Sequence, residues 1–493
     1  MWEIEDTFTK FLYPFQLRLQ EHTGLSDASL ALTAVRSRVD AVADLCPLWL
    51  ECQFQDEELD NMLPYVKQYV KLPENHRRYM INPILLKQLD NMQTNRMNAD
   101  EAGFQISAID LHLFFNGVGF LVFEVQPSCI SCGPVTMAWI EDLNADLASL
   151  SQGKPMWQRN FGQLATCADD STDMPGLFLG EPTTTKELIA SLLQPLCQEQ
   201  TVSCWQALVD TFLPVYGAIL LRPEADTPHR QANMQFKEFV IEHGIVLRKT
   251  LPSNNRNRFS QQLLDDPLHN YLPYHNVVHT QSLEGGFALA YDNGVSHFQG
   301  HNSGAMRSFR TNYFYMMLLA LHQRMSILCY EMAAADATRN SDPATLLRTL
   351  REQIYDFAAR CYFSQASFSE ERDQLYRRWQ RAFNINQMYD ELKDQVHDIE
   401  GYLAQVARDR ELDARESELR QEAERNRLIA LITLVLLPVS IAAGLIQASP
   451  VVSNWIHRGS AAGTAELTVA SAAIAISVII ASLALKMRRS RKE

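Results

Sequence analysis

The stretch SAIDLHLFFNGVGFLVFEVQP, residues Ser107–Pro127, predicts the centre of the fold. Asn116 and Gly117 separate two apolar runs, and Asn-Gly is the strongest short signal for a β-hairpin because both residues tolerate a positive φ. Apolar side chains alternate along the first run, whereas the second run is apolar on both faces. A strand of the second kind is typical of a covered, central position in a sheet.

Segments after this hairpin extend the prediction to an α+β fold, with an α/β-type cytosolic domain over residues 101–302. A helical pattern is present in TTKELIASLLQPL (184–196). Three further runs predict strands, and these are VYGAILLRP (215–223), HGIVLRKTL (243–251) and GGFALAYDNG (285–294).

The region before this domain, residues 1–100, is expected to be helical. FLYPFQLRLQEH (11–22) and NMLPYVKQYVKL (61–72) both carry apolar residues at helical spacing. We therefore expect a helical N-terminal region that precedes the sheet.

Residues 303–427 are predicted to form long helices that end in a stalk. The run 312–337 is apolar nearly all round but is interrupted by His322, Gln323 and Arg324, which indicates a buried helix rather than a membrane span. A long helix is expected from about Asn386. Its apolar residues step by four and three in a coiled-coil rhythm, at Leu392, Val396, Ile399, Leu403 and Val406.

The net charge of −14 is divided unevenly along the 493 residues. From Leu428 to Glu493 six basic side chains stand against two acidic ones, a net of +4, which leaves −18 on the preceding part. The residues before Leu428 are so negatively charged that they repel the phosphate backbone of a nucleic acid. Nucleic acid is therefore not an expected partner. The start MWEIEDTFTKF does not predict a signal peptide, so the nine cysteines are expected to be reduced in the cytosol.

Two apolar stretches near the C-terminus predict a transmembrane domain over residues 428–493. Leu428–Gln447 and Leu467–Leu485 are each long enough to cross a bilayer as a helix. The tail KMRRSRKE is basic, and basic flanks stay in the cytoplasm. We therefore expect a multi-pass protein of the inner (plasma) membrane, with the lipid bilayer as a partner and with both termini in the cytoplasm.

Polar residues recur at every seventh position along the first predicted span. Heptad-spaced residues drift by only ~20° per step and share one face of a helix. Polar side chains in lipid turn towards protein or water, so several copies would surround a common pore. Hydrogen-bonded packing of helices is the alternative reading. The predicted pore-lining residues are Leu412, Leu419, Asn426, Thr433, Ser440 and Gln447.

The arrangement resembles the CorA family of divalent-cation channels. The local match is PVSIAAG, where Pro438 and Gly444 are the candidate kink and packing positions. The resemblance implies a homo-oligomer, a pentamer, with the first span lining the pore. The Gly-Met-Asn signature that forms the filter of this family is absent, because the equivalent residues are Gln447, Ala448 and Ser449.

The resemblance implies an ion channel gated through its cytosolic domain, and the missing signature leaves its selectivity open. Two alternatives are kept. One is a housekeeping Mg²⁺ transporter. The other is a ligand-gated membrane effector of an antiviral system of the type III CRISPR kind, which would bind a nucleotide-type small molecule. An enzyme is not predicted, no cofactor is indicated, and Mg²⁺ is the candidate permeant ion or regulator.

Two further groups of residues are candidates for binding a metal or a ligand. His275 and His279 belong to a segment with five histidines between His269 and His301, and their spacing can bind zinc if the segment is helical. Arg307 and Arg310 precede a predicted helix, where they could hold an anion such as phosphate. Ordinary surface or core histidines, and arginines paired with carboxylates, are the alternatives.

Overall fold

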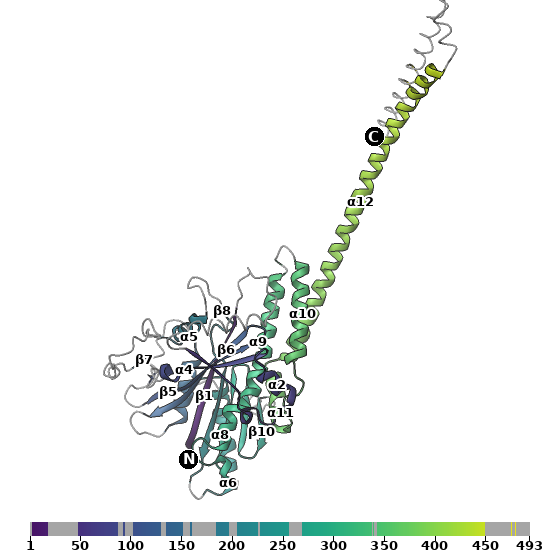
Figure 1. Cartoon of the computed structure of the whole chain (residues 1–493). Helices are drawn as coiled ribbons and strands as arrows, with labels where there is room; N and C mark the ends of the chain where they lie inside the picture. Colours follow the sequence, from purple (N-terminus) through teal and green to yellow (C-terminus); the bar gives the residue numbers. More distant parts are fainter. Residues whose placement is uncertain are drawn as a thin grey trace, which may run out of the picture. The chain divides into compact units, whose positions relative to one another are not determined.

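The structure is a computed structural model (Figure 1). It describes residues 2–17, 48–86, 92–93, 102–129, 135–150, 158–159, 184–196, 205–224, 227–255, 269–337, 339, 343–448, 475 and 479. The chain divides into two compact units, Met1–Asp398 and Ile399–Glu493. The first unit contains the sheet and the helices that cover it, so residues of the predicted 1–100, 101–302 and 303–427 regions share one core.

The strands of the first unit form one twelve-stranded sheet in the order β10-β11-β12-β9-β1-β6-β5-β3-β2, with the short β4, β7 and β8 off this path. The strands along the path pair antiparallel except β9 and β12, which are parallel. The strands are β1 Glu3–Leu17, β2 Trp49–Cys52, β3 His76–Ile81, β4 Met92–Gln93, β5 Ala102–Phe114, β6 Val118–Cys129, β7 Gln158–Arg159, β8 Trp205–Ala207, β9 Val215–Arg222, β10 Asn270–Tyr274, β11 Val277–Gln281 and β12 Gly285–Tyr291.

The hairpin predicted from the sequence is confirmed as β5 and β6. Its turn closes with a hydrogen bond from the Gly117 N–H to the Phe114 carbonyl at 3.0 Å. Only Gly117 has a positive φ, of 80°, so the turn is not the expected one in which Asn116 also adopts that conformation. This geometry is that of a longer hairpin loop in which glycine takes the left-handed position.

The expected helix at 11–22 is wrong where the structure describes it, because residues up to Leu17 belong to β1. This strand pairs with β6 on one side and with β9 and then β8 on the other. Its side chains are buried on both faces, so the alternation that identifies a half-buried strand is missing from its sequence. Pro14 lies opposite the gap between β9 and β8, where its lack of an N–H costs no ladder bond.

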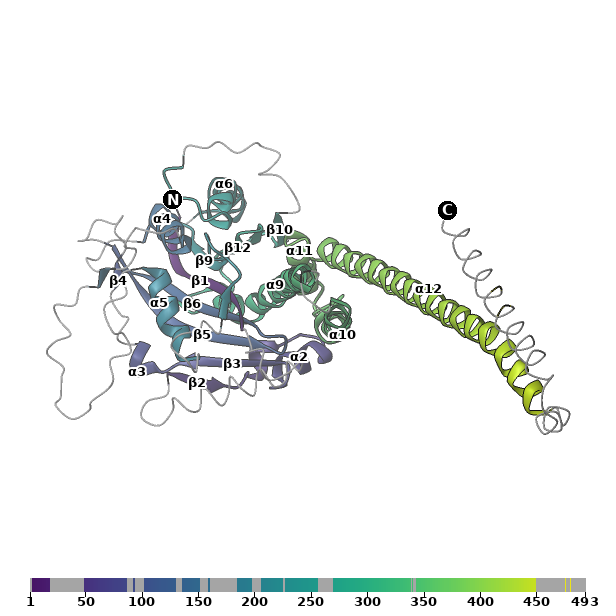
Figure 2. The same cartoon turned by 90° about the horizontal axis from the view of Figure 1, so that it is seen from above.

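Helices cover both faces of the sheet. Successive residues of β11 show this, because Thr280 donates to the Gly244 carbonyl of α6 whereas the His279 ring stacks on Tyr313 of η8. Figure 2 shows α4 and α6 together on one side. The helices are α2 Pro64–Lys71, α3 Pro83–Leu86, α4 Met137–Ala148, α5 Thr185–Leu193, α6 His229–Arg248, α8 Gly304–Ser308, the π-helix η8 Phe309–Tyr313, α9 Phe314–Ala337, α10 Pro343–Cys361, α11 Glu370–Ala382 and α12 Ile385–Ala448, with 3₁₀ turns η3 Asp56–Leu59, η6 Gln194–Leu196 and η7 Ser296–Phe298.

Of two further expected elements, one changes its identity in the structure and one is confirmed. The strand predicted at HGIVLRKTL is wrong, because residues up to Arg248 are the C-terminal part of α6. A short apolar run does not distinguish a strand from a buried helix, and Gly244 lies against Thr280 on the face that α6 packs on the sheet. The helix predicted at 184–196 is confirmed as α5, which begins with a capping box between Thr184 and Glu187.

The expectation of two C-terminal membrane-spanning helices is corrected by the structure. Among the residues that it describes, no helix is sufficiently long and apolar to cross a membrane. Leu428–Gln447 does not form a separate helix but is the end of the 64-residue α12, which is charged along much of its length. Of the second expected span, only Ala475 and Ile479 lie within the described residues.

Candidate functional site

Three consecutive polar residues in the middle of α9 connect the sheet to the other helices. α9 is otherwise apolar and buried, as expected from the sequence. His322, Gln323 and Arg324 point ~100° apart around the helix axis, so each one meets a different neighbour. The structure thereby explains why an apolar helix is interrupted at this position.

Each of the three side chains has a defined partner. The Nε2 of His322 lies 3.2 Å from the Asn116 Oδ1 in the β5–β6 turn. The Nε2 of Gln323 donates to the Cys361 carbonyl at 2.6 Å and to the Tyr376 hydroxyl at 2.7 Å, on α10 and α11.

Arg324 donates from Nη1 to the Phe383 carbonyl at 2.6 Å, two residues before α12 begins. α9 is thus bonded to the sheet, to α10 and α11, and to the connection that leads into α12. A displacement of α9 would therefore be transmitted to the start of α12 through direct hydrogen bonds.

A buried network of charges lies on the sheet face near α9. The Lys10 Nζ is 3.0 Å from the Glu124 Oε2, and the Arg310 Nε is 3.2 Å from the Glu124 Oε1. Arg310 also lies 3.5 Å from Asp6. Burial raises the pKa of Glu124, but the charges of Lys10 and Arg310 outweigh that effect and hold it below its usual value. Glu124 is therefore a carboxylate that two cations neutralise inside the protein.

A second buried charge group continues the network towards β3. Arg78 lies 2.8 Å from Glu58 and 3.1 Å from Asp110. Sequence reasoning missed both groups, although one signal was available. Lys10 and Glu124 are isolated charges inside apolar runs of strand residues, and a charge in such a place is buried only with a partner.

The predicted anion site at Arg307 and Arg310 is not formed as expected. Arg310 belongs to η8 and is held by Asp6 and Glu124, which is the alternative that the sequence left open. Arg307 is exposed on α8. The helix starts earlier than predicted, at Gly304, where the Ser303 hydroxyl accepts from the Met306 N–H at 3.3 Å.

The two candidate histidines are not on one helical face. His275 is exposed in the turn between β10 and β11, and His279 is buried in β11 with its ring stacked on Tyr313 at 5.0 Å. Burial lowers the pKa of His279 to about 3. In the described part of the chain no group of three or more histidine, cysteine, aspartate or glutamate side chains could hold a metal ion.

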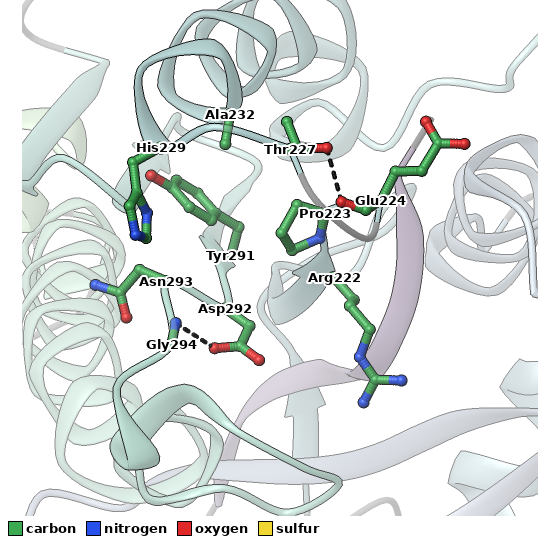
Figure 3. A pocket seen from close by; sticks show the side chains of 10 residues that line it. All are labelled: Arg222, Pro223, Glu224, Thr227, His229, Ala232, Tyr291, Asp292, Asn293 and Gly294. Carbon is green, nitrogen blue, oxygen red and sulfur yellow. Dashed lines mark hydrogen bonds between the residues drawn. The ribbon is translucent and has the colours of Figure 1, made fainter.

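A pocket of about 250 Å³ opens where the parallel strands β9 and β12 end, beside the start of α6 (Figure 3). Two of its charged groups have partners within the protein, since Arg222 pairs with Glu5 and Asp292 accepts from the Gly294 N–H at 2.8 Å. We assign no ligand to it. It is lined by Arg222, Pro223, Glu224, Thr227, His229, Ala232, Tyr291, Asp292, Asn293 and Gly294.

The predicted pore-lining residues lie on α12, and their side chains are exposed from Leu412 to Ser440. The Thr433 hydroxyl donates to the Ile429 carbonyl at 2.8 Å, and the Ser440 hydroxyl donates to the Leu437 carbonyl at 3.0 Å. These hydroxyls are satisfied by their own helix and do not need a water-filled pore. The pore lining therefore stays a prediction.

The positions taken from the family resemblance lie at the end of α12. The helix runs without interruption through Pro438 and Gly444 and ends at Ala448. The side chain of Gln447 and the whole of Ser449 lie outside the described residues, so the filter-equivalent positions stay predictions as well.

No family model matches the chain, and no curated protein is significantly similar to it.

Proposed function

We propose that the chain is the subunit of a homo-oligomeric ion channel of the CorA-like kind, acting at the plasma membrane. In this proposal α12 joins the copies, and the first unit regulates conduction through α9. The crossing of the bilayer is not assigned to α12, in keeping with the lack of a long enough apolar helix among the described residues.

The observation that carries the proposal is the apolar surface of α12. Six of its large apolar side chains between Leu428 and Leu437 are 46–60% exposed in the single chain. They point in all directions around the helix, and a helix of this kind is normally covered by protein or lipid. Association of copies, in contact with lipid, would cover it.

The distribution of charged side chains along α12 supports the association of identical copies of this helix. Between Arg408 and Arg427 the helix carries both signs in similar number, and one ion pair, between Glu416 and Arg420 at 2.6 Å, is formed there among the described residues. A neighbouring copy would offer partners to the remaining charges. Leu412 and Leu419 are more than 60% exposed in the same segment and would meet their equivalents in a parallel assembly.

The test combines cross-linking with an ion flux measurement on the full chain. Leu419→Cys should form covalent dimers under mild oxidation, whereas Ser417→Cys, ~160° away around the helix, should form few. The native cysteines are the same in both variants, so they cancel in the comparison. Vesicles that contain the protein should pass K⁺ or Mg²⁺, measured from the reversal potential under opposed gradients.

Two results would contradict the proposal. A monomer by light scattering, in detergent and without it, would remove the assembly. An assembled protein that passes no ion would keep the assembly and reject the channel. Equal cross-linking at the two positions would show that the copies meet through another face of α12.

A further inference from the structure

Three buried histidines and one phenylalanine form a column of stacked rings between the sheet and α9. The rings of His112 and His76 are stacked with centroids 5.2 Å apart, and His76 stacks on Phe114 at 4.4 Å. Phe114 in turn stacks on His322 of α9 at 3.8 Å. None of the three histidines is more than 3% exposed.

The hydrogen bonds of the first pair define its protonation. The Nδ1 of His76 lies 3.3 Å from the Val70 carbonyl, which can only accept, so this nitrogen carries the proton. The Nε2 of neutral His76 is then an acceptor, and the Nδ1 of His112 donates to it at 3.1 Å. The Nε2 of His112 remains as a buried acceptor without a partner among the described residues.

The same reasoning defines which ring nitrogen of His322 carries the proton. The amide nitrogen of Asn116 donates to the Ser326 hydroxyl at 2.7 Å, so the Asn116 Oδ1 faces the Nε2 of His322 as an acceptor. The Nε2 therefore carries the proton. The Nδ1 of His322 is buried and has no partner within the described residues. Each ring is thus neutral, and an added proton would occupy a buried nitrogen with nothing to receive it.

The surroundings of the column would not compensate a positive charge. Lys10 of β1 and Arg78 of β3 are the cations near it, and they are engaged by Glu124, Glu58 and Asp110. The other titratable neighbours are phenols and a thiol. They are Tyr69 on α2, Tyr315 and Tyr330 on α9, and Cys361 on α10, and burial raises the pKa of each.

We propose that the column His112–His76–Phe114–His322 is a proton-sensitive joint, at which acidification separates α9 from the β5–β6 hairpin. Protonation at the Nδ1 of His322 or the Nε2 of His112 places a charge on a buried ring at one end of the column, and at His112 this charge lies near Arg78 and Lys10. Arg324 of α9 donates a hydrogen bond to the Phe383 carbonyl, so separation of α9 from the hairpin also weakens the attachment of the start of α12. The joint lies within the first unit and functions whether or not the chain conducts ions.

The direction of the effect follows from linkage. Burial lowers the pKa of His76 to about 3 and holds those of His112 and His322 well below the usual value. The folded state therefore binds fewer protons than the unfolded state, in which histidine titrates near 6.5. Stability is complete above that pH and falls below it. At pH 5.5 each neutral histidine raises the unfolding constant about tenfold relative to pH 7.5.

The experiment compares unfolding of the full chain at these two values of pH, by urea titration. In the wild type the unfolding constant should rise steeply on acidification, and His322→Phe should reduce this ratio about tenfold. Any structural cost of the substitution cancels in the ratio. His275→Phe, at the exposed turn, is the matched control and should leave the ratio unchanged.

A measurement on the unaltered protein keeps the test independent of whether the variant folds. Amide hydrogen exchange, corrected for the intrinsic effect of pH, should accelerate in α9 and at the start of α12 at pH 5.5 while β1 and β6 stay protected. An unchanged pH ratio in His322→Phe would overturn the proposal. So would exchange in α9 that does not exceed exchange in the central strands.

Discussion

The chain contains two long apolar helical stretches that have opposite surroundings. α9 is enclosed by the sheet, α10 and α11, and side chains such as Met316 and Met317 are fully buried. In the stretch from Leu428 to Leu437 of α12, six large apolar side chains are each about half exposed. Apolar composition therefore shows only that a helix must be covered. What covers it is indicated by its polar residues, which in α9 reach three different neighbours and in α12 bond to their own helix.

The largest expected difference between the two regions concerns their charges. Glu124→Gln leaves Lys10 and Arg310 without their shared carboxylate inside the first unit, and should lower its free energy of unfolding by about 4 kcal/mol. Glu416→Gln removes the exposed ion pair with Arg420 and should change the free energy of unfolding by less than about 0.5 kcal/mol. Urea unfolding of both variants measures the difference. Similar losses would show that the charges near α9 are not isolated from water.

The second prediction compares the removal of a buried leucine of α9 with the removal of an exposed leucine of α12. Leu321→Ala removes a side chain that is 1% exposed and should destabilise the first unit by about 3 kcal/mol, through lost burial and the cavity left behind. Leu437→Ala, in the exposed stretch, should leave that unit unchanged. The midpoint of thermal unfolding reports both effects. A loss at Leu437 as large as that at Leu321 would contradict the separation of the chain into two units.

The smallest effect is expected at the connection from the enclosed helices to α12. Asn384 has a positive φ of 56° between α11 and α12, a conformation that asparagine and glycine tolerate best. Asn384→Ala should cost about 1 kcal/mol, whereas Asn384→Gly should be close to neutral because glycine adopts this conformation freely. Urea titration of the two variants measures how much each substitution lowers the free energy of unfolding. Equal costs would point to the side-chain bond with Gln387 instead of the backbone.

Sequence patterns predicted the parts of the fold that local signals define. The β5–β6 hairpin has a turn dipeptide between two apolar runs, and α9 has a polar interruption that a membrane span would not have. β1 could not be predicted in the same way, since both of its faces are buried and its apolar residues fall at helical spacing by coincidence. The first predicted span was wrong because its apolar length was read without the rest of the 64-residue helix. Of the second, only Ala475 and Ile479 lie within the described residues.

The site was less predictable than the fold. His322, Gln323 and Arg324 were recognised as an interruption, but their partners Asn116, Cys361 and Phe383 are distant in sequence. The histidine column likewise joins β3, β5 and α9, which only the tertiary structure brings together. Spacing rules that apply to one element cannot find a group assembled from three. They selected His275 and His279 instead, which the structure separates.

The central position of β1 has a consequence for how the chain acquires its structure. β1 precedes its partners β6, β8 and β9 by about 100 to 200 residues, so its two edges are completed only after long stretches of later sequence are made. Loops of this length close slowly, and contacts between distant residues slow folding. Until β9 arrives, the part of the sheet made of β1, β6, β5, β3 and β2 has an open apolar edge at β1. We therefore expect nascent chains that stop before Arg222 to require a chaperone.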